Sequence, residues 1–129
     1  MERIGGELLL GTGAAVPLSL GVRVGDFVFV SGQLALRHGR IVGSDIRTQT
    51  ATTLDNVAGV LAQAGLTLAD VCKVTVWLTN AEDFPAFNAI YAEHMSVPFP
   101  ARSTVVAELL LPGALIEIEV IAYRRVDAK

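Results

Sequence analysis

The sequence has a single cysteine, few basic residues and no cluster of positive charge. Cys72 has no second cysteine for an intrachain disulfide and no Cys-x-x-Cys partner for a metal. Ten Lys and Arg residues against thirteen Asp and Glu residues give a formal net charge of -3, and the basic residues are scattered along the chain. Because binding to a phosphate backbone requires clustered positive charge, we expect no nucleic-acid partner.

The chain also lacks long hydrophobic runs and a secretion signal. Hydrophobic residues make up 52% of it, but no apolar run approaches the roughly 18 residues of a membrane span. The first 20 residues have no basic start, and Glu7 interrupts their apolar stretch. We therefore expect a cytoplasmic protein with no membrane partner, built as one domain over residues 1–129.

Motifs for cofactors and metals are missing as well. The sequence contains no Gly-x-Gly-x-x-Gly or Walker segment, and Gly11-Thr12-Gly13 alone is weak evidence for phosphate binding. His38 and His94 stand outside any His-x-His or HExxH pattern, so solvated or capping roles are favoured over metal binding. We expect no cofactor and no metal.

Hydrophobic periodicity predicts alternating strands and helices. We expect strands at 24–36, 71–79, 101–111 and 115–125, a turn with a short returning strand at 38–43, and helices at 45–64 and within 80–95. Asp45 and Gly65 are candidate caps of the first helix, and Pro85 suits the first turn of the second. Pro112-Gly113 favours a turn, so the last two strands are expected to pair as a hairpin. Cys72, in an alternating strand, is expected to be a buried structural thiol.

This order of elements predicts an α/β (α+β) two-layer sandwich, with both helices on one face of a mixed sheet. In the last strand, alternation places Ile116 and Ile118 toward one face and Glu117, Glu119 and Tyr123 toward the other. The side away from the helices thus carries both acidic and apolar residues. We expect this face to pack against other subunits in a ring.

Two charged residues are candidates for chemistry. Arg102 opens a strand, where a guanidinium can hold a carboxylate through two parallel hydrogen bonds; the alternative, which composition alone favours, is a surface arginine paired with a nearby acid. Glu117 shares a strand face with Glu119, and sequestered like charges raise a carboxyl pKa toward the range of a proton shuttle. Exposed glutamates are the alternative. Ser31 lacks a nucleophile elbow, so a hydroxyl donor is favoured, beside a Gly32 that lets the backbone approach a ligand.

With these residues in place, the chain resembles the Rid (YjgF-type) family of reactive-intermediate deaminases. The resemblance rests on VFVSGQ, LDNV, LADVCKVTVWLTNAEDFPAFNAIY, FPARSTV and IEIEVIAYRR, from Val24 to Arg125. It implies a homotrimer with a chorismate-mutase-like fold, a central barrel of three sheets and active sites between subunits. It also implies cofactor-free hydrolysis of 2-imino and 2-enamino acids to 2-keto acids and ammonia, a form of metabolite damage control.

The resemblance also assigns roles to residues. It implies that Arg102 holds the substrate carboxylate, that Glu117 positions water and relays protons, and that Ser31 and Asn88 lie at the pocket or support it. Two positions depart from the family pattern: Leu18 replaces a common tyrosine and makes the pocket mouth more apolar, and Thr104 replaces a common cysteine. The alternative function is a regulatory trimer that binds small carboxylates without turnover. An endoribonuclease is disfavoured by the acidic charge.

Overall fold

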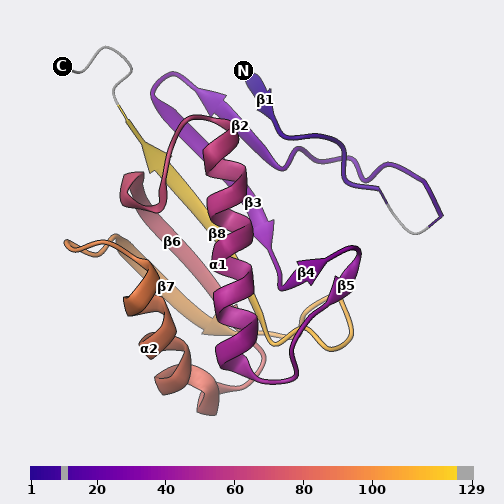
Figure 1. Ribbon diagram of the computed structural model, residues 1–129, viewed down its shortest axis with the longest axis vertical. Helices are drawn as coiled ribbons and strands as arrows, with labels where there is room; N and C mark the ends of the chain where they lie inside the picture. The colour runs from indigo at the N-terminus through magenta and orange to yellow at the C-terminus, as the bar shows by residue number, and fades with distance from the viewer. Residues whose placement is uncertain (10–11, 125–129) are drawn as a thin grey trace.

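The computed structural model describes residues 1–9 and 12–124. The strands are β1 (Glu2–Ile4), β2 (Gly21–Val24), β3 (Phe27–Gln33), β4 (Leu36–Arg37), β5 (Arg40–Ile41), β6 (Val71–Leu78), β7 (Ala101–Val106) and β8 (Ile116–Tyr123). The helices are α1 (Ile46–Gln63) and α2 (Phe84–His94), with short 3-10 turns η1 (Leu68–Asp70) and η2 (Ala81–Asp83) (Figure 1). The predicted continuation of the last strand to Arg125 lies outside the described residues.

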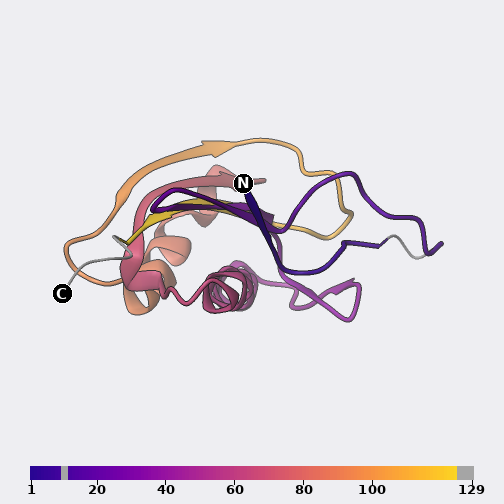
Figure 2. The same cartoon turned by 90° about the horizontal axis from the view of Figure 1, so that it is seen from above.

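Six strands form one sheet in the order β1-β2-β3-β8-β6-β7, and β4 pairs with β5 in a separate ribbon. All neighbours in the large sheet are antiparallel except β6 and β7, which are parallel. Both helices cover the same face (Figure 2). The predicted mixed sheet with two helices on one face is therefore confirmed. Among the described residues, neither helix has the length and apolar character needed to cross a membrane.

The first helix begins and ends where its capping residues predict. The Asp45 side chain accepts a hydrogen bond from the Thr48 backbone N–H at 3.1 Å, which satisfies a donor that the first turn leaves free. After the last helical residue, Gly65 adopts a φ of +77°, a left-handed conformation that glycine enters without steric cost. Because Leu54, Val57 and Leu61 are fully buried, α1 packs its apolar stripe onto the sheet.

The two faces of the sheet differ in the way that alternation in β8 predicts. Ile116, Ile118, Val120 and Ala122 are buried under the helices and belong to the hydrophobic core. The opposite face, which we call the open face, carries Phe27, Phe29 and Tyr123, each about 40% exposed, and the rings of Phe27 and Tyr123 lie 4.9 Å apart. An aromatic cluster of this kind on a bare sheet face is typical of a protein–protein contact.

The predicted hairpin between the last two strands is wrong. β8 lies between β3 and β6, whereas β7 pairs in parallel with the other edge of β6. The helix α2 joins β6 to β7, and a helical crossover of this kind is what allows two consecutive strands to run in parallel. The fully apolar buried side of β8 suits a central strand, while β7, with half-exposed residues, forms the sheet edge.

One further expectation is wrong, and two short strands were not predicted. Cys72 is exposed rather than buried, because the register of β6 against β8 shifts between Val71 and Lys73 and turns the intervening side chain away from the core. Its Sγ lies 3.3 Å from the carbonyl oxygen of Ile121. The short strands β1 and β2 were not predicted, since the first 23 residues show little periodicity.

A fully buried glutamine connects α1 to the start of β8. The Gln49 Nε2 group donates to the carbonyl oxygens of Gly43 at 3.0 Å and Gly113 at 2.9 Å, and Oε1 accepts from the Leu115 N–H at 2.8 Å. These bonds fix the segment that leads directly into Ile116 and Glu117. Gln49 thus supports the backbone from which Glu117 projects.

Replacing Gln49 by leucine should destabilise the fold markedly. The substitution conserves size but removes three part-buried hydrogen bonds to the backbone and leaves Gly43, Gly113 and Leu115 without these partners, which should cost roughly 2–4 kcal/mol of unfolding free energy. Urea denaturation measures the loss, and Gln63→Leu, at an exposed position in the last turn of the same helix, is the matched control. A loss below about 1 kcal/mol, comparable to an ordinary surface change, would contradict the assigned role.

Candidate functional site

Arg102 lies at the edge of the sheet beneath α2. Its pairing with Val74 places its side chain on the helix-covered face, because residues paired across strands point to the same side. The guanidinium donates to the Asn88 Oδ1 atom at 2.8 Å. Its central carbon lies 4.7, 5.0 and 5.6 Å from the ring centroids of Tyr91, Phe87 and Phe84, respectively. We call these three rings with Asn88 the arginine cage.

The charge of Arg102 is held without a counter-ion. Among the described residues no carboxylate forms an ion pair with it, so the alternative of a surface arginine paired with an acid is wrong for this part of the chain. Aromatic faces stabilise a cation while leaving its N–H donors free to bind an anion. Beside the guanidinium is a hollow of about 440 Å³ lined by Asn88, Tyr91, Phe99 and Pro100.

Tyr91 belongs to this site, although its sequence pattern predicts only a core position on α2. It is 5% exposed, and its hydroxyl has no hydrogen-bond partner within the described part of the chain. Burial raises the pKa of this hydroxyl and outweighs the opposing charge of Arg102. The available signal was its helical spacing from Phe87 and Asn88, which puts all three over the strand that carries Arg102.

Glu117 projects from the open face, on the other side of the sheet. It pairs with Trp77, whereas Arg102 pairs with Val74, three residues away in the same strand and on the opposite face. Partial burial raises the pKa of the Glu117 carboxyl, and the charge of Glu119 raises it further. The predicted direction of this shift is confirmed, with burial as the larger cause.

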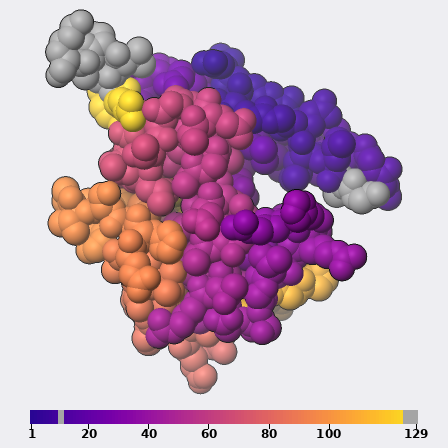
Figure 3. All heavy atoms as spheres, viewed as in Figure 1, coloured from indigo at the N-terminus to yellow at the C-terminus, as the bar shows by residue number. Residues whose placement is uncertain are grey.

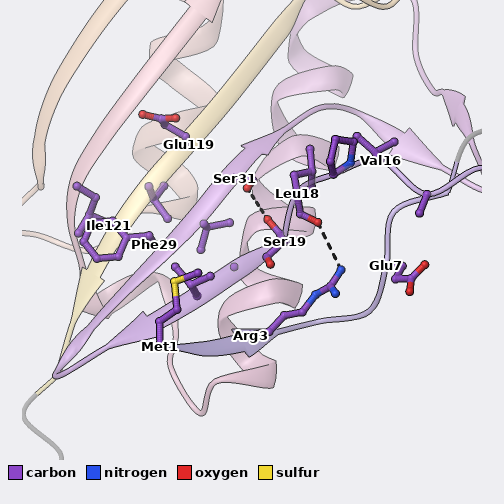
Figure 4. Close-up of a pocket in the computed structure, with 16 residues that line it drawn as sticks. Met1, Arg3, Glu7, Val16, Leu18, Ser19, Phe29, Ser31, Glu119 and Ile121 are labelled. Carbon is purple, nitrogen blue, oxygen red and sulfur yellow. Dashed lines mark hydrogen bonds between the residues drawn. The ribbon is translucent and has the colours of Figure 1, made fainter.

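Ser31, Gly32 and Leu18 gather around Glu117. A Cβ atom at Gly32 would collide with the Glu117 carboxylate where it now lies, so a larger residue at this position would force the Glu117 side chain to move. The Ser31 hydroxyl donates to the Ser19 carbonyl at 2.6 Å. Leu18 lies beside this bond, and Glu119 faces the same hollow of about 780 Å³ from β8 (Figure 4). Glu117 faces an adjoining hollow of about 320 Å³.

The residues predicted for one site therefore occupy two regions of the chain. Arg102 and Asn88 lie together on the helix side, and Leu18, Ser31, Gly32 and Glu117 lie together on the other. Thr104 lies two residues from Arg102 on the same side of β7, next to the arginine cage: its buried hydroxyl has no partner among the described residues, and it lines a small hollow with Leu78 and the cage residue Phe84. Within the described part of one chain, the sheet separates Arg102 from Glu117.

Comparison with known proteins agrees with this architecture. The family model described as Endoribonuclease L-PSP matches residues 11–124. A 2-iminobutanoate/2-iminopropanoate deaminase of Dermatophagoides farinae is 38% identical over 105 residues, 80% of this chain and 82% of that protein. The solved YjgF gene product of E. coli is 36% identical with a TM-score of 0.82, covering 97% of this chain and 100% of that one. E. coli TdcF, solved with bound serine, is 34% identical with a TM-score of 0.81, covering 96% and 99%.

The fold and these matches define an α+β protein of the YjgF-like class. The chain belongs to the Endoribonuclease L-PSP family, which is the YjgF-type family that its sequence motifs resemble. The predicted family membership is confirmed.

Proposed function

We propose that the protein is a cofactor-independent hydrolase of the cytoplasm that converts 2-imino and 2-enamino acids to 2-keto acids and ammonia. The observation that carries this proposal is the Arg102 guanidinium, which is held by aromatic rings and a neutral amide and has no counter-ion within residues 1–9 and 12–124. A site of this kind suits a small carboxylate. The deaminase name of a relative at 38% identity supports the reaction class.

In the proposed reaction, Arg102 binds the substrate carboxylate through two parallel hydrogen bonds. Glu117 takes a proton from a water molecule whose oxygen attacks C2 of the imine, and it then delivers that proton to the nitrogen. As the resulting carbinolamine collapses, its hydroxyl proton passes to the nitrogen, the keto C=O bond forms, the C–N bond breaks and ammonia leaves. An enamine first takes a proton at C3 and loses one from its nitrogen, which gives the imine. Water is the only co-reactant.

The proposed active unit is a homotrimer with sites between subunits. Arg102 and Glu117 lie on opposite faces of one sheet, so one copy's Arg102 edge must meet another copy's open face to complete a site. The aromatic cluster of Phe27, Phe29 and Tyr123 provides that face with an apolar contact surface. A closed ring of three copies would use the same contact three times.

The activity is tested by generating imines with an amino-acid oxidase and measuring keto acid and ammonia. We expect release faster than in buffer, and no acceleration with any side chain would refute the proposal. A second candidate, a sensor that binds small carboxylates without turnover, is favoured by the bound serine in TdcF. Calorimetric binding of 2-oxobutanoate without any turnover would support that candidate instead.

The shared site is tested by mixing two inactive variants. Arg102→Ala and Glu117→Gln should each be inactive alone, but co-refolded in equal amounts they should recover about a quarter of the wild-type activity, because about one site in four then receives both intact residues. A mixture of Arg102→Ala with the double variant is the control and should stay inactive. Absence of recovery in properly assembled mixtures would contradict a site between subunits.

A further inference from the structure

The hollow that Glu117 faces is lined by leucines. Its volume is about 320 Å³, at the small end of the roughly 300–1,000 Å³ typical of ligand pockets. Five leucines form its apolar walls: Leu8, Leu18, Leu20, Leu34 and Leu36. We call this the leucine pocket. Figure 3 shows the molecule opening between the N-terminal segment and the β4–β5 ribbon, the two parts of the chain that contribute most of these side chains.

One wall of the leucine pocket is held by backbone hydrogen bonds. The N–H of Val16 donates to the Leu8 carbonyl at 2.8 Å, and the N–H of Leu18 donates to the Val16 carbonyl at 2.7 Å. The N–H of Ser31 in β3 donates to the Leu20 carbonyl at 2.9 Å. These bonds tie the segment that carries Leu18 to the strand beside Glu117.

The other wall is held by a single side chain from α1. The Asn56 Nδ2 group donates to the carbonyl oxygens of Leu34 at 2.8 Å and Leu36 at 2.9 Å. Both bonds fix the backbone that leads from β3 into β4. The pocket is thus a preformed feature of the fold, which reduces the ordering cost of filling it.

Charge decides which part of a substrate can enter. Glu117 and Glu119 both line the leucine pocket, and none of the described residues that line it is basic. The two acids repel a carboxylate, so the substrate carboxylate should bind to Arg102 instead. Arg102 forms no ion pair with any of the described residues. The leucine walls favour an uncharged aliphatic group, since burying each additional CH₂ group contributes to binding.

We propose that the leucine pocket binds the substrate side chain and selects imino acids with larger aliphatic side chains, such as the one formed from leucine, over those with a methyl group or a polar side chain. This inference rests on the proposed function, because it places the reacting carbon next to Glu117. A four-carbon side chain fits within this volume and can contact the leucine walls over a larger apolar area than the methyl group of the alanine-derived imine. Leu18, at the mouth of the pocket, is a specificity-determining residue.

The experiment compares imines made in situ from leucine, alanine and asparagine. Asparagine matches the shape of leucine but is polar, so it separates size from polarity. Competition with a semicarbazide trap gives the relative kcat/KM of each imine. We expect the leucine-derived imine to exceed both others by about 10-fold or more, since single groups in an apolar pocket discriminate by roughly this factor.

Two variants assign the preference to the pocket. Leu18→Asn should move the leucine-to-alanine ratio toward 1, and the ratio is insensitive to the amount of folded protein. Leu9→Asn, at an exposed neighbour outside the pocket lining, should keep the wild-type ratio. Calorimetry with 4-methyl-2-oxopentanoate and pyruvate, measured on the same proteins, should show the same preference in binding.

Each failure has its own signature. Active protein with a leucine-to-alanine ratio near or below 1 overturns the pocket assignment and leaves the proposed function standing. An unchanged ratio in Leu18→Asn also overturns it. If no imine is turned over, the proposed function is refuted. In that case the binding data decide the pocket assignment: equal binding of the two keto acids overturns it, and tighter binding of 4-methyl-2-oxopentanoate supports it.

Discussion

Replacing Arg102 by alanine should lower kcat/KM for imine hydrolysis by about 10³-fold. Two hydrogen bonds between charged groups would be lost, each contributing roughly 1.5–3 kcal/mol, and about 1.4 kcal/mol corresponds to a factor of ten. The loss should be large because the arginine cage supplies no second cation: Asn88 and the rings of Phe84, Phe87 and Tyr91 are neutral. Steady-state rates with in situ imines measure it.

The controls for Arg102 separate charge from geometry. Arg102→Lys keeps the charge but loses the bidentate fork, so it should recover only part of the activity. Arg37→Ala removes an exposed arginine that lies 3.5 Å from Asp55 and does not belong to the arginine cage, so its kcat/KM should stay near the wild-type value. Arg102→Ala with activity within tenfold of wild type would show that the carboxylate is bound elsewhere.

Replacing Glu117 by glutamine should lower kcat/KM by about 10²–10⁴-fold, the usual contribution of a positioned acid or base. The amide keeps the shape that fits against Gly32 but cannot carry a proton between water and nitrogen. Binding of a keto acid, measured by calorimetry, should weaken much less than the rate. Glu82→Gln, at an exposed position in η2, is the control and should retain most of the activity. Equal losses in the two variants would contradict a specific role of Glu117.

The raised pKa of Glu117 also predicts how Glu117→Gln changes the stability of the protein. Because the folded pKa lies above the unfolded value, folding favours the protonated carboxyl, and this contribution to stability is lost as pH rises through the folded pKa. Glu117→Gln should therefore have a higher Tm than wild type near pH 7, with the difference shrinking toward about pH 4. The wild-type activity requires the ionised Glu117 carboxyl. As the solution is acidified, the activity should therefore decline at a higher pH than it would if this glutamate had an ordinary pKa. A Tm difference independent of pH would contradict the shift.

Local rules predicted the parts of the fold that local interactions determine. The capping residue Asp45, the glycine after α1 and the alternation in β8 depend on nearby chain, and each was read correctly. The pairing of β7 depends instead on α2 carrying the chain across to the far edge of β6, which turn residues such as Pro112-Gly113 do not report. The prediction that Cys72 is buried was wrong for a related reason: a bulge reverses which side chains face the core, and no sequence pattern marks it.

The sequence motifs supplied candidate site residues but not their arrangement in space. The sequence motifs identified Arg102 and Glu117, and alternation gave the face of Glu117 correctly. Alternation within β7 could not show that Arg102 points to the other face. Which side of β7 faces α2 depends on its parallel register with β6, and the sequence does not reveal that register. Tyr91 was missed as a cage residue because its spacing is equally typical of a core helix.

The placement of Arg102 and Glu117 on opposite faces of one sheet has an evolutionary consequence. On the proposed arrangement, a substitution in the Phe27–Tyr123 cluster would be selected for its effect on assembly and on turnover together, since loosening the contact would also pull the catalytic groups apart. Selection for activity would then preserve the quaternary contact as well. A lineage of such proteins could change its substrate through positions such as Leu18 far more freely than it could change its oligomeric state.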